Sequence, residues 1–301
     1  MSKLTCWVSL LFACGCASSN SSVGGVDTSQ DGSADLATGG SSTGGGGGTV
    51  STGTVGENGG AAGRSAGQGG TGVADAGGTS FDPCPLGKPC AVMPFGDSIT
   101  AGSGSSGGGG YRVELFAQTV EAGKSLTFVG SQSSGPDTVG GVPFPKQNEG
   151  YPGYTIDGKM GILPLAATAL HAGKPNIVLL MIGTNDVNGY VDLANAPARL
   201  GNLIDTVVDT DPNLLLVVAK IVPTTDDAEN GRIQPYNDAI PAVVAARVTA
   251  GKHVILVDMY SAFTANAGYK TEDMFNFIHP NDAGYVVMGD VWFAAIQSYL
   301  H

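Results

Sequence analysis

Residues 91–99 read AVMPFGDSI, a short apolar run that ends in Gly-Asp-Ser. Such an unbroken hydrophobic run is typical of a strand buried on both faces of a parallel sheet. Similar runs recur along the chain, with helical patterns between them. We expect strands at 91–95, 125–131, 177–182, 214–221 and 254–258, and helices at 111–122, 158–172, 193–209, 234–250 and 282–300. This alternation predicts an α/β fold, a three-layer doubly wound sandwich with a mostly parallel five-stranded sheet.

Four short motifs on successive loops suit acyl transfer. They are GDSI at 96–99 with Ser98, GYPGY at 150–154 with Gly153, GTND at 183–186 with Asn185, and HP at 279–280 with His279. A serine hydroxyl becomes a useful nucleophile when a neutral imidazole takes its proton. The backbone N–H groups of Ser98 and Gly153 and the side-chain amide of Asn185 could stabilise the resulting oxyanion. Each residue alone could be an ordinary cap or turn, so the prediction of an ester-cleaving enzyme depends on their combination.

These motifs resemble those of the SGNH, or GDSL-like, hydrolase family over most of residues 81–301. GYR at 110–112, FVGS at 128–131, NEGYPGYTI at 148–156 and HPN at 279–281 look like the acetyl xylan esterase branch, carbohydrate esterase family 3. The resemblance implies a flavodoxin-like fold, Ser98 as nucleophile, His279 as base, and an oxyanion hole formed by Ser98, Gly153 and Asn185. The substrate it implies is acetylated polysaccharide such as xylan; a lipase or lysophospholipase of the same family is the alternative.

Four aromatic or basic residues flank the expected site. The residues that could contact sugar rings are Tyr111, Arg112, Tyr151 and Tyr154. Tyrosine and arginine are equally suited to the edge of a core or to an ion pair. Both interpretations stay open.

The chain departs from the family at Asn276. The family usually carries aspartate three residues before this histidine, where the carboxylate orients the imidazole and stabilises the imidazolium. Asparagine can hydrogen-bond the ring but carries no negative charge. Three interpretations remain: Asn276 orients His279; a backbone carbonyl or another carboxylate, Asp273 being the nearest, replaces it; or catalysis is weak or lost and the domain is a non-catalytic glycan-binding module.

The first 80 residues predict export and a tether. Residues 1–16 combine Lys3 with a short apolar run, as in a signal peptide, and LFACGC at 11–16 resembles a bacterial lipobox with Cys14 or Cys16 as the lipidated residue. Residues 17–80 hold 21 glycines in 64 positions and no aromatic residue, which predicts a disordered Gly/Ser-rich linker. Residues 81–301 then form the hydrolase domain. We expect an exported lipoprotein anchored at the outer or cell-surface membrane, or otherwise a secreted protein.

The net charge of the chain excludes some classes of partner, and the two cysteines outside the predicted signal peptide predict a disulfide. A net charge of −12 argues against nucleic acid and anionic lipid surfaces, and no apolar run after the signal is long enough to span a membrane. Cys84 and Cys90 bracket a short segment at the start of the domain, where an exported protein is expected to form a disulfide. No Cys/His spacing suggests a metal site. We expect no cofactor, and a monomer.

Overall fold

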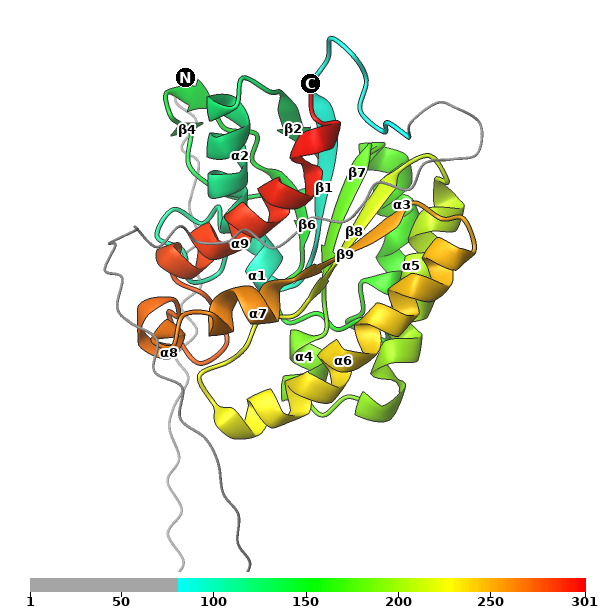
Figure 1. Ribbon diagram of the computed structural model, residues 1–301, viewed down its shortest axis with the longest axis vertical. Coiled ribbons are helices and arrows are strands. Elements are labelled where there is room, and N and C mark those ends of the chain that lie inside the picture. Colours follow the sequence, from blue (N-terminus) through cyan, green and yellow to red (C-terminus); the bar gives the residue numbers. More distant parts are fainter. Residues whose placement is uncertain (1–80) are drawn as a thin grey trace, which may run out of the picture. The chain divides into compact units, whose positions relative to one another are not determined.

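The computed structural model of the chain describes residues 81–301 (Figure 1). The predicted signal peptide at 1–16, the predicted linker at 17–80 and the lipidation predicted at Cys14 or Cys16 lie outside the described residues. Within residues 81–301, no helix is both long enough and apolar enough to cross a membrane.

A seven-stranded, mostly parallel sheet forms the middle layer. The strand β1 (Cys90–Gly96) pairs on one side with β7 (Ile177–Met181), which is followed by β8 (Leu215–Lys220) and β9 (Val254–Asp258). On its other side β1 pairs first with β2 (Leu126–Phe128) and then, near its carboxyl end, with β6 (Gln147–Gly150). The short β3 (Gln132–Ser133) joins β6 in antiparallel orientation, and β4 (Thr138–Val139) and β5 (Val142–Pro143) form a separate hairpin.

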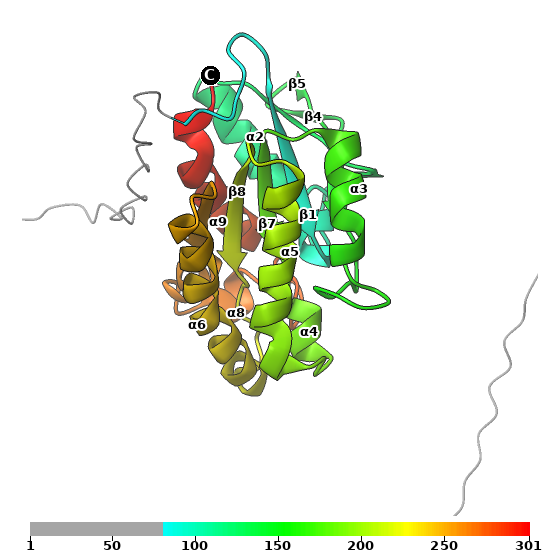
Figure 2. The same cartoon turned by 90° about the vertical axis from the view of Figure 1, so that its right-hand side faces the viewer.

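Helices cover both faces of this sheet (Figure 2). α2 (Tyr111–Glu121) and α9 (Asp282–Ile296) pack together on one face, and α3 (Leu163–Gly173) and α5 (Ala196–Thr210) pack together on the other. α6 (Asp227–Thr249) contacts α5 and the edge strand β9. The shorter elements are α1 (Ser98–Ala101), α4 (Thr184–Asn188), η1 (Leu193–Asn195), α7 (Met259–Thr264), α8 (Tyr269–Glu272) and η2 (Gln297–Tyr299). The predicted three-layer α/β architecture is confirmed.

The sheet differs from the prediction in its number of strands, because β3 and β6 join the five that were expected. β6 has the sequence QNEG, which carries no hydrophobic signal, yet Asn148 and Glu149 are buried. Their polar atoms are satisfied locally: Asn148 Oδ1 accepts from the Gly150 N–H at 2.9 Å, and Glu149 Oε1 accepts from the Ser131 N–H at 2.6 Å. The strand predicted at 125–131 is shorter, Leu126–Phe128.

Two helices begin away from their predicted starts. α3 begins at Leu163 rather than at residue 158, because Pro164 suits the first turn of a helix, where its missing N–H costs nothing. α6 begins at Asp227 rather than at residue 234, because Asp226 caps its first turn by accepting from the Glu229 N–H at 2.9 Å.

The core lies against both faces of the sheet. All five residues of β7 are buried, as are nearly all those of β1 and β8, which explains their unbroken apolar sequences. At the amino end of β1 a disulfide joins Cys84 to Cys90 and ties the start of the domain to the sheet.

Candidate active site

Ser98 and His279 lie in direct contact at the carboxyl edge of the sheet. Ser98 opens α1 immediately after β1, and its Oγ lies 2.8 Å from Nε2 of His279. Asp97 caps α1 by accepting from the Ile99 N–H at 2.9 Å, so the short helix fixes the serine at the end of the strand. A hydroxyl hydrogen-bonded to an imidazole is the pairing that nucleophilic acyl transfer requires.

The loop that carries His279 is a tight turn. The carbonyl of His279 accepts from the Phe275 N–H at 2.9 Å, and the adjacent backbone crowds against Gly104. Gly104 has φ +96°, and a Cβ there would lie 3.1 Å from Cβ of His279 and 2.4 Å from the Pro280 carbonyl oxygen. Glycine is therefore required at this approach of the glycine-rich loop to the histidine.

The ring of His279 has Asn276 as its second neighbour. Nδ2 of Asn276 lies 3.0 Å from Nδ1 of His279. Asp273, the carboxylate that the sequence offered as a substitute, is buried elsewhere, where its Oδ2 accepts from Asn266 at 3.0 Å. Burial lowers the pKa of His279 below its ordinary value of 6.5, which favours the neutral ring.

Gly153 and Asn185 follow the two strands that flank β1. The Gly153 loop leaves β6, where the Tyr151 N–H donates to the Gly96 carbonyl at 2.9 Å, and Asn185 lies on α4 directly after β7. Gly153 has φ +81°, a conformation that favours glycine. Since β6, β1 and β7 are adjacent and parallel at this edge, the loops carrying Gly153, Ser98 and Asn185 leave the sheet side by side.

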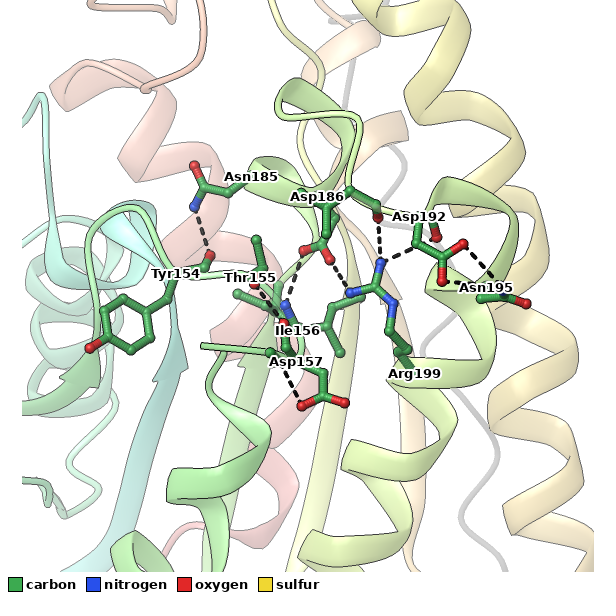
Figure 3. Close-up of polar contacts among 12 residues, drawn as sticks. Tyr154, Thr155, Ile156, Asp157, Asn185, Asp186, Asp192, Asn195 and Arg199 are labelled. Atoms are coloured by element: carbon green, nitrogen blue, oxygen red, sulfur yellow. Dashed lines mark hydrogen bonds and ion pairs between the residues drawn. The ribbon is translucent and has the colours of Figure 1, made fainter. Parts of the chain in front are cut away.

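Figure 3 shows how Asn185 is held. Its Nδ2 donates to the Tyr154 carbonyl oxygen at 2.8 Å. An amide nitrogen carries two hydrogens, so the second remains for another acceptor. The contact also joins the two loops that were expected to supply oxyanion donors.

An ion pair between Asp186 and Arg199 was not predicted (Figure 3). Asp186 Oδ1 accepts from Arg199 Nη1 at 2.6 Å, and its Oδ2 accepts from the Ile156 N–H at 3.0 Å. Arg199 Nη2 also donates to the carbonyl of Val191 at 2.6 Å. Asp186 thus links the turn that carries Asn185 to the loop that carries Gly153. The acidic residue beside Asn185 was visible in the sequence, but nothing there identified its partner on α5.

Asp97 is fully enclosed next to Ser98. The pKa of Asp97 is raised from 3.8 to about 7, chiefly by burial and also by the nearby carboxylate of Asp186, against the lowering effect of the Ile99 N–H. Asp97 therefore keeps its proton to a higher pH than an exposed aspartate does.

The residues considered for sugar contact divide into two pairs. Tyr111 and Arg112 are fully buried, and Arg112 donates to the carbonyls of Ser134 at 3.0 Å and Lys146 at 3.1 Å, so both serve the core. Tyr151 and Tyr154 are half-buried, with ring centroids 5.1 Å apart.

Two exposed aromatic residues next to the site escaped the sequence analysis. Phe275 is 66% exposed and Phe277 is 46% exposed, on either side of Asn276. The Thr225 N–H donates to the Phe277 carbonyl at 2.9 Å, which pins this turn to the loop after β8. Both side chains therefore present apolar surface to solvent in the turn that carries Asn276.

Comparison with known proteins agrees with this geometry. Residues 95–287 match the GDSL-like Lipase/Acylhydrolase family. The chain is 32% identical over 232 residues to a multidomain esterase of Ruminococcus flavefaciens, a match covering 69% of this chain and 28% of that protein. It therefore spans only about a quarter of that relative's length.

Solved structures of carbohydrate esterases are similar to the domain. A family 3 carbohydrate esterase of Clostridium thermocellum has 32% sequence identity and a TM-score of 0.59, with 70% of this chain and 96% of that chain covered. A carbohydrate esterase family 3 protein of Talaromyces cellulolyticus has 27% identity and a TM-score of 0.57, with 70% and 98% covered. An acetyl esterase variant solved with an acetate ion has 26% identity, a TM-score of 0.57 and the same coverage, 70% and 98%. With its motifs in order on a doubly wound sheet, the chain belongs to the GDSL-like lipase/acylhydrolase family and resembles that family's carbohydrate esterases.

Proposed function

We propose that this chain is a serine esterase in which Ser98 is the nucleophile and His279 is the base. The observation that carries the proposal is the 2.8 Å contact between Ser98 Oγ and His279 Nε2. Ser98 Oγ attacks the ester carbonyl carbon while its proton passes to Nε2, and the backbone N–H groups of Ser98 and Gly153 and the amide of Asn185 stabilise the oxyanion. The alcohol leaves with the proton from Nε2, and water then hydrolyses the acyl-enzyme by the same route in reverse.

The substrate we propose is an acetyl ester on a polysaccharide such as acetylated xylan. The similarity to family 3 carbohydrate esterases and to an acetyl esterase supports it. The exposed rings of Phe275 and Phe277 support it too, because sugar rings present C–H faces that pack on aromatic surfaces. A signal at 1–16, a tether at 17–80 and a lipid anchor at Cys14 or Cys16 would place a monomeric enzyme outside the cell, where such a polymer is found; these remain part of the proposal.

The test is acetate release from acetylated xylan and from a small aryl acetate by the full chain. Ser98→Ala and His279→Ala should each abolish release. Ser106→Ala and His171→Ala are matched controls, since both residues are exposed and take no part in the proposed reaction. Activity that persists in Ser98→Ala would refute the proposed nucleophile. A preference for long acyl chains over acetyl would replace the proposed substrate with that of a lipase or lysophospholipase.

A second candidate, glycan binding with little turnover, is favoured by one observation: the group facing His279 Nδ1 is the neutral amide of Asn276 rather than a carboxylate. Xylan binding by a folded chain that hydrolyses no ester would support this candidate over the esterase.

A further inference from the structure

The orientation of the Asn276 side chain is fixed by its own backbone. Its Oδ1 lies 3.0 Å from the Ile278 nitrogen and 2.8 Å from the His279 nitrogen, and both are N–H donors. An amide nitrogen carries hydrogens and cannot accept from them, so the atom facing the two N–H groups must be the oxygen. The NH2 group therefore faces Nδ1 of His279, at 3.0 Å.

This direction determines the tautomer of the ring. A neutral imidazole carries its hydrogen on one nitrogen and a lone pair on the other. Nδ1 must offer its lone pair to the Asn276 amide, so the hydrogen resides on Nε2. Nε2–H then donates to Ser98 Oγ, whereas general-base catalysis needs a lone pair on Nε2 to accept the serine proton.

We propose that Asn276 is a positioning residue that holds His279 in the Nε2–H tautomer and so keeps hydrolysis slow. The inference rests on the proposed function of Ser98 and His279. Reversing the tautomer would bring Nδ1–H against the Asn276 NH2 group. Turning the amide over would relieve that clash but would set the NH2 group against the two backbone N–H donors, with the loss of both hydrogen bonds.

An aspartate at the same position would have the opposite effect. One carboxylate oxygen would accept from the two backbone N–H groups, and the other would accept from Nδ1–H, which frees the Nε2 lone pair for Ser98. The other acidic groups of this region have partners of their own: Asp273 accepts from Asn266, and Asp282 Oδ1 accepts from the Ser106 N–H at 2.9 Å. The carboxylate of Asn276→Asp would thus be the one acting on Nδ1.

The first experiment reads the tautomer directly in the wild-type chain. Long-range proton–nitrogen NMR spectra of the full chain, labelled with nitrogen-15, distinguish Nε2–H from Nδ1–H imidazole. The chain has four histidines, and the His279 signals are those that disappear in His279→Ala. We expect the Nε2–H pattern for His279 in the wild type and the Nδ1–H pattern in Asn276→Asp. An Nδ1–H pattern in the wild type would overturn the proposal, whatever the activity.

The second experiment is kinetic. Asn276→Asp should raise kcat on an aryl acetate by at least about 10-fold and up to about 10⁴-fold, the loss known for the reverse change in a serine protease. The acidic limb of its pH profile should also move to higher pH, because the new carboxylate stabilises the imidazolium. The matched control Asn202→Asp adds the same charge on the exposed face of α5 and should change neither.

An unchanged or lower kcat in Asn276→Asp would refute the positioning role. Combining Ser98→Ala with Asn276→Asp separates this result from the proposed function. If the gain survives the loss of Ser98, the assigned nucleophile is wrong; if it disappears, the gain passes through Ser98.

Discussion

The buried ion pair between Asp186 and Arg199 offers a sharp test of how the oxyanion loops are held. Their side chains are 0% and 14% exposed, and the joining atoms are 2.6 Å apart. Arg199→Met keeps most of the apolar stem but removes the cation, which leaves the Asp186 carboxylate with neutral backbone donors such as the Ile156 N–H. Removing one partner of a buried pair costs about 3–5 kcal/mol.

The lower part of that range applies at neutral pH, because Asp186 can bind a proton and so avoid the cost of an unpaired buried charge. Burial already raises its pKa above 3.8, and loss of the guanidinium would raise it further. A cost of about 3 kcal/mol lowers the Tm of a domain of this size by roughly 6–12 °C. The loss should be smaller at pH 5 than at pH 7.5, since the variant then folds with a protonated Asp186.

Thermal unfolding of the full chain at both pH values provides the measurement. Lys252→Met is the matched control, because its pair with Asp209 is exposed and should be worth less than about 1 kcal/mol. Adding Asp186→Asn to Arg199→Met should recover part of the loss, as no buried charge is then left unpaired. A Tm for Arg199→Met within about 2 °C of the wild type at both pH values would refute this reasoning.

Two further predictions concern the residues around Ser98. The pKa of Asp97 is about 7 in the folded protein against an ordinary 3.8, so Asp97 contributes stability at low pH that falls by about 1.4 kcal/mol per pH unit from pH 4 to 7. In urea unfolding, Asp97→Asn should remove this contribution from the pH slope of the wild type, and an unchanged slope would contradict the assignment. Asn185→Ala should lower kcat by about 10²–10³-fold, because it removes an oxyanion donor. Asn188→Ala, on the exposed end of the same helix, is the control and should leave kcat unchanged. A loss in Asn185→Ala no larger than in this control would exclude Asn185 from the oxyanion hole.

The strands that the sequence predicted are those in which the buried residues are apolar. β1, β7 and β8 lie in the middle of the sheet and read as continuous hydrophobic runs. β6 was missed because its buried residues Asn148 and Glu149 are polar and are satisfied by nearby loops. Polar residues that are buried with their hydrogen bonds satisfied leave no hydrophobic pattern in the sequence.

In the candidate site, too, some residues were indicated by the sequence and others became evident only in the structure. Ser98, His279, Gly153 and Asn185 were singled out as candidates because they lie in short motifs, and the structure puts the first two in contact. The Arg199 partner of Asp186 could not be found, since the pairing exists only once the fold brings Arg199 of α5 to Asp186 of α4. Arg112 looked equally suited to sugar or core, and its full burial and its hydrogen bonds to Ser134 and Lys146 assign it to the core.

Asn276 shows how a chain can keep the fold of its family while its hydrolysis is slow. The turn around it is built from the Phe275 N–H to His279 carbonyl bond and from one side-chain oxygen that accepts two backbone N–H groups. Aspartate and asparagine supply that oxygen equally well, so the fold places no demand on which of the two is present. They differ in the single atom that faces Nδ1 of His279, and that atom decides whether Nε2 carries a lone pair or a hydrogen. The scaffold of an esterase can therefore be kept intact while one atom, outside both the core and the nucleophile, sets the rate of its chemistry.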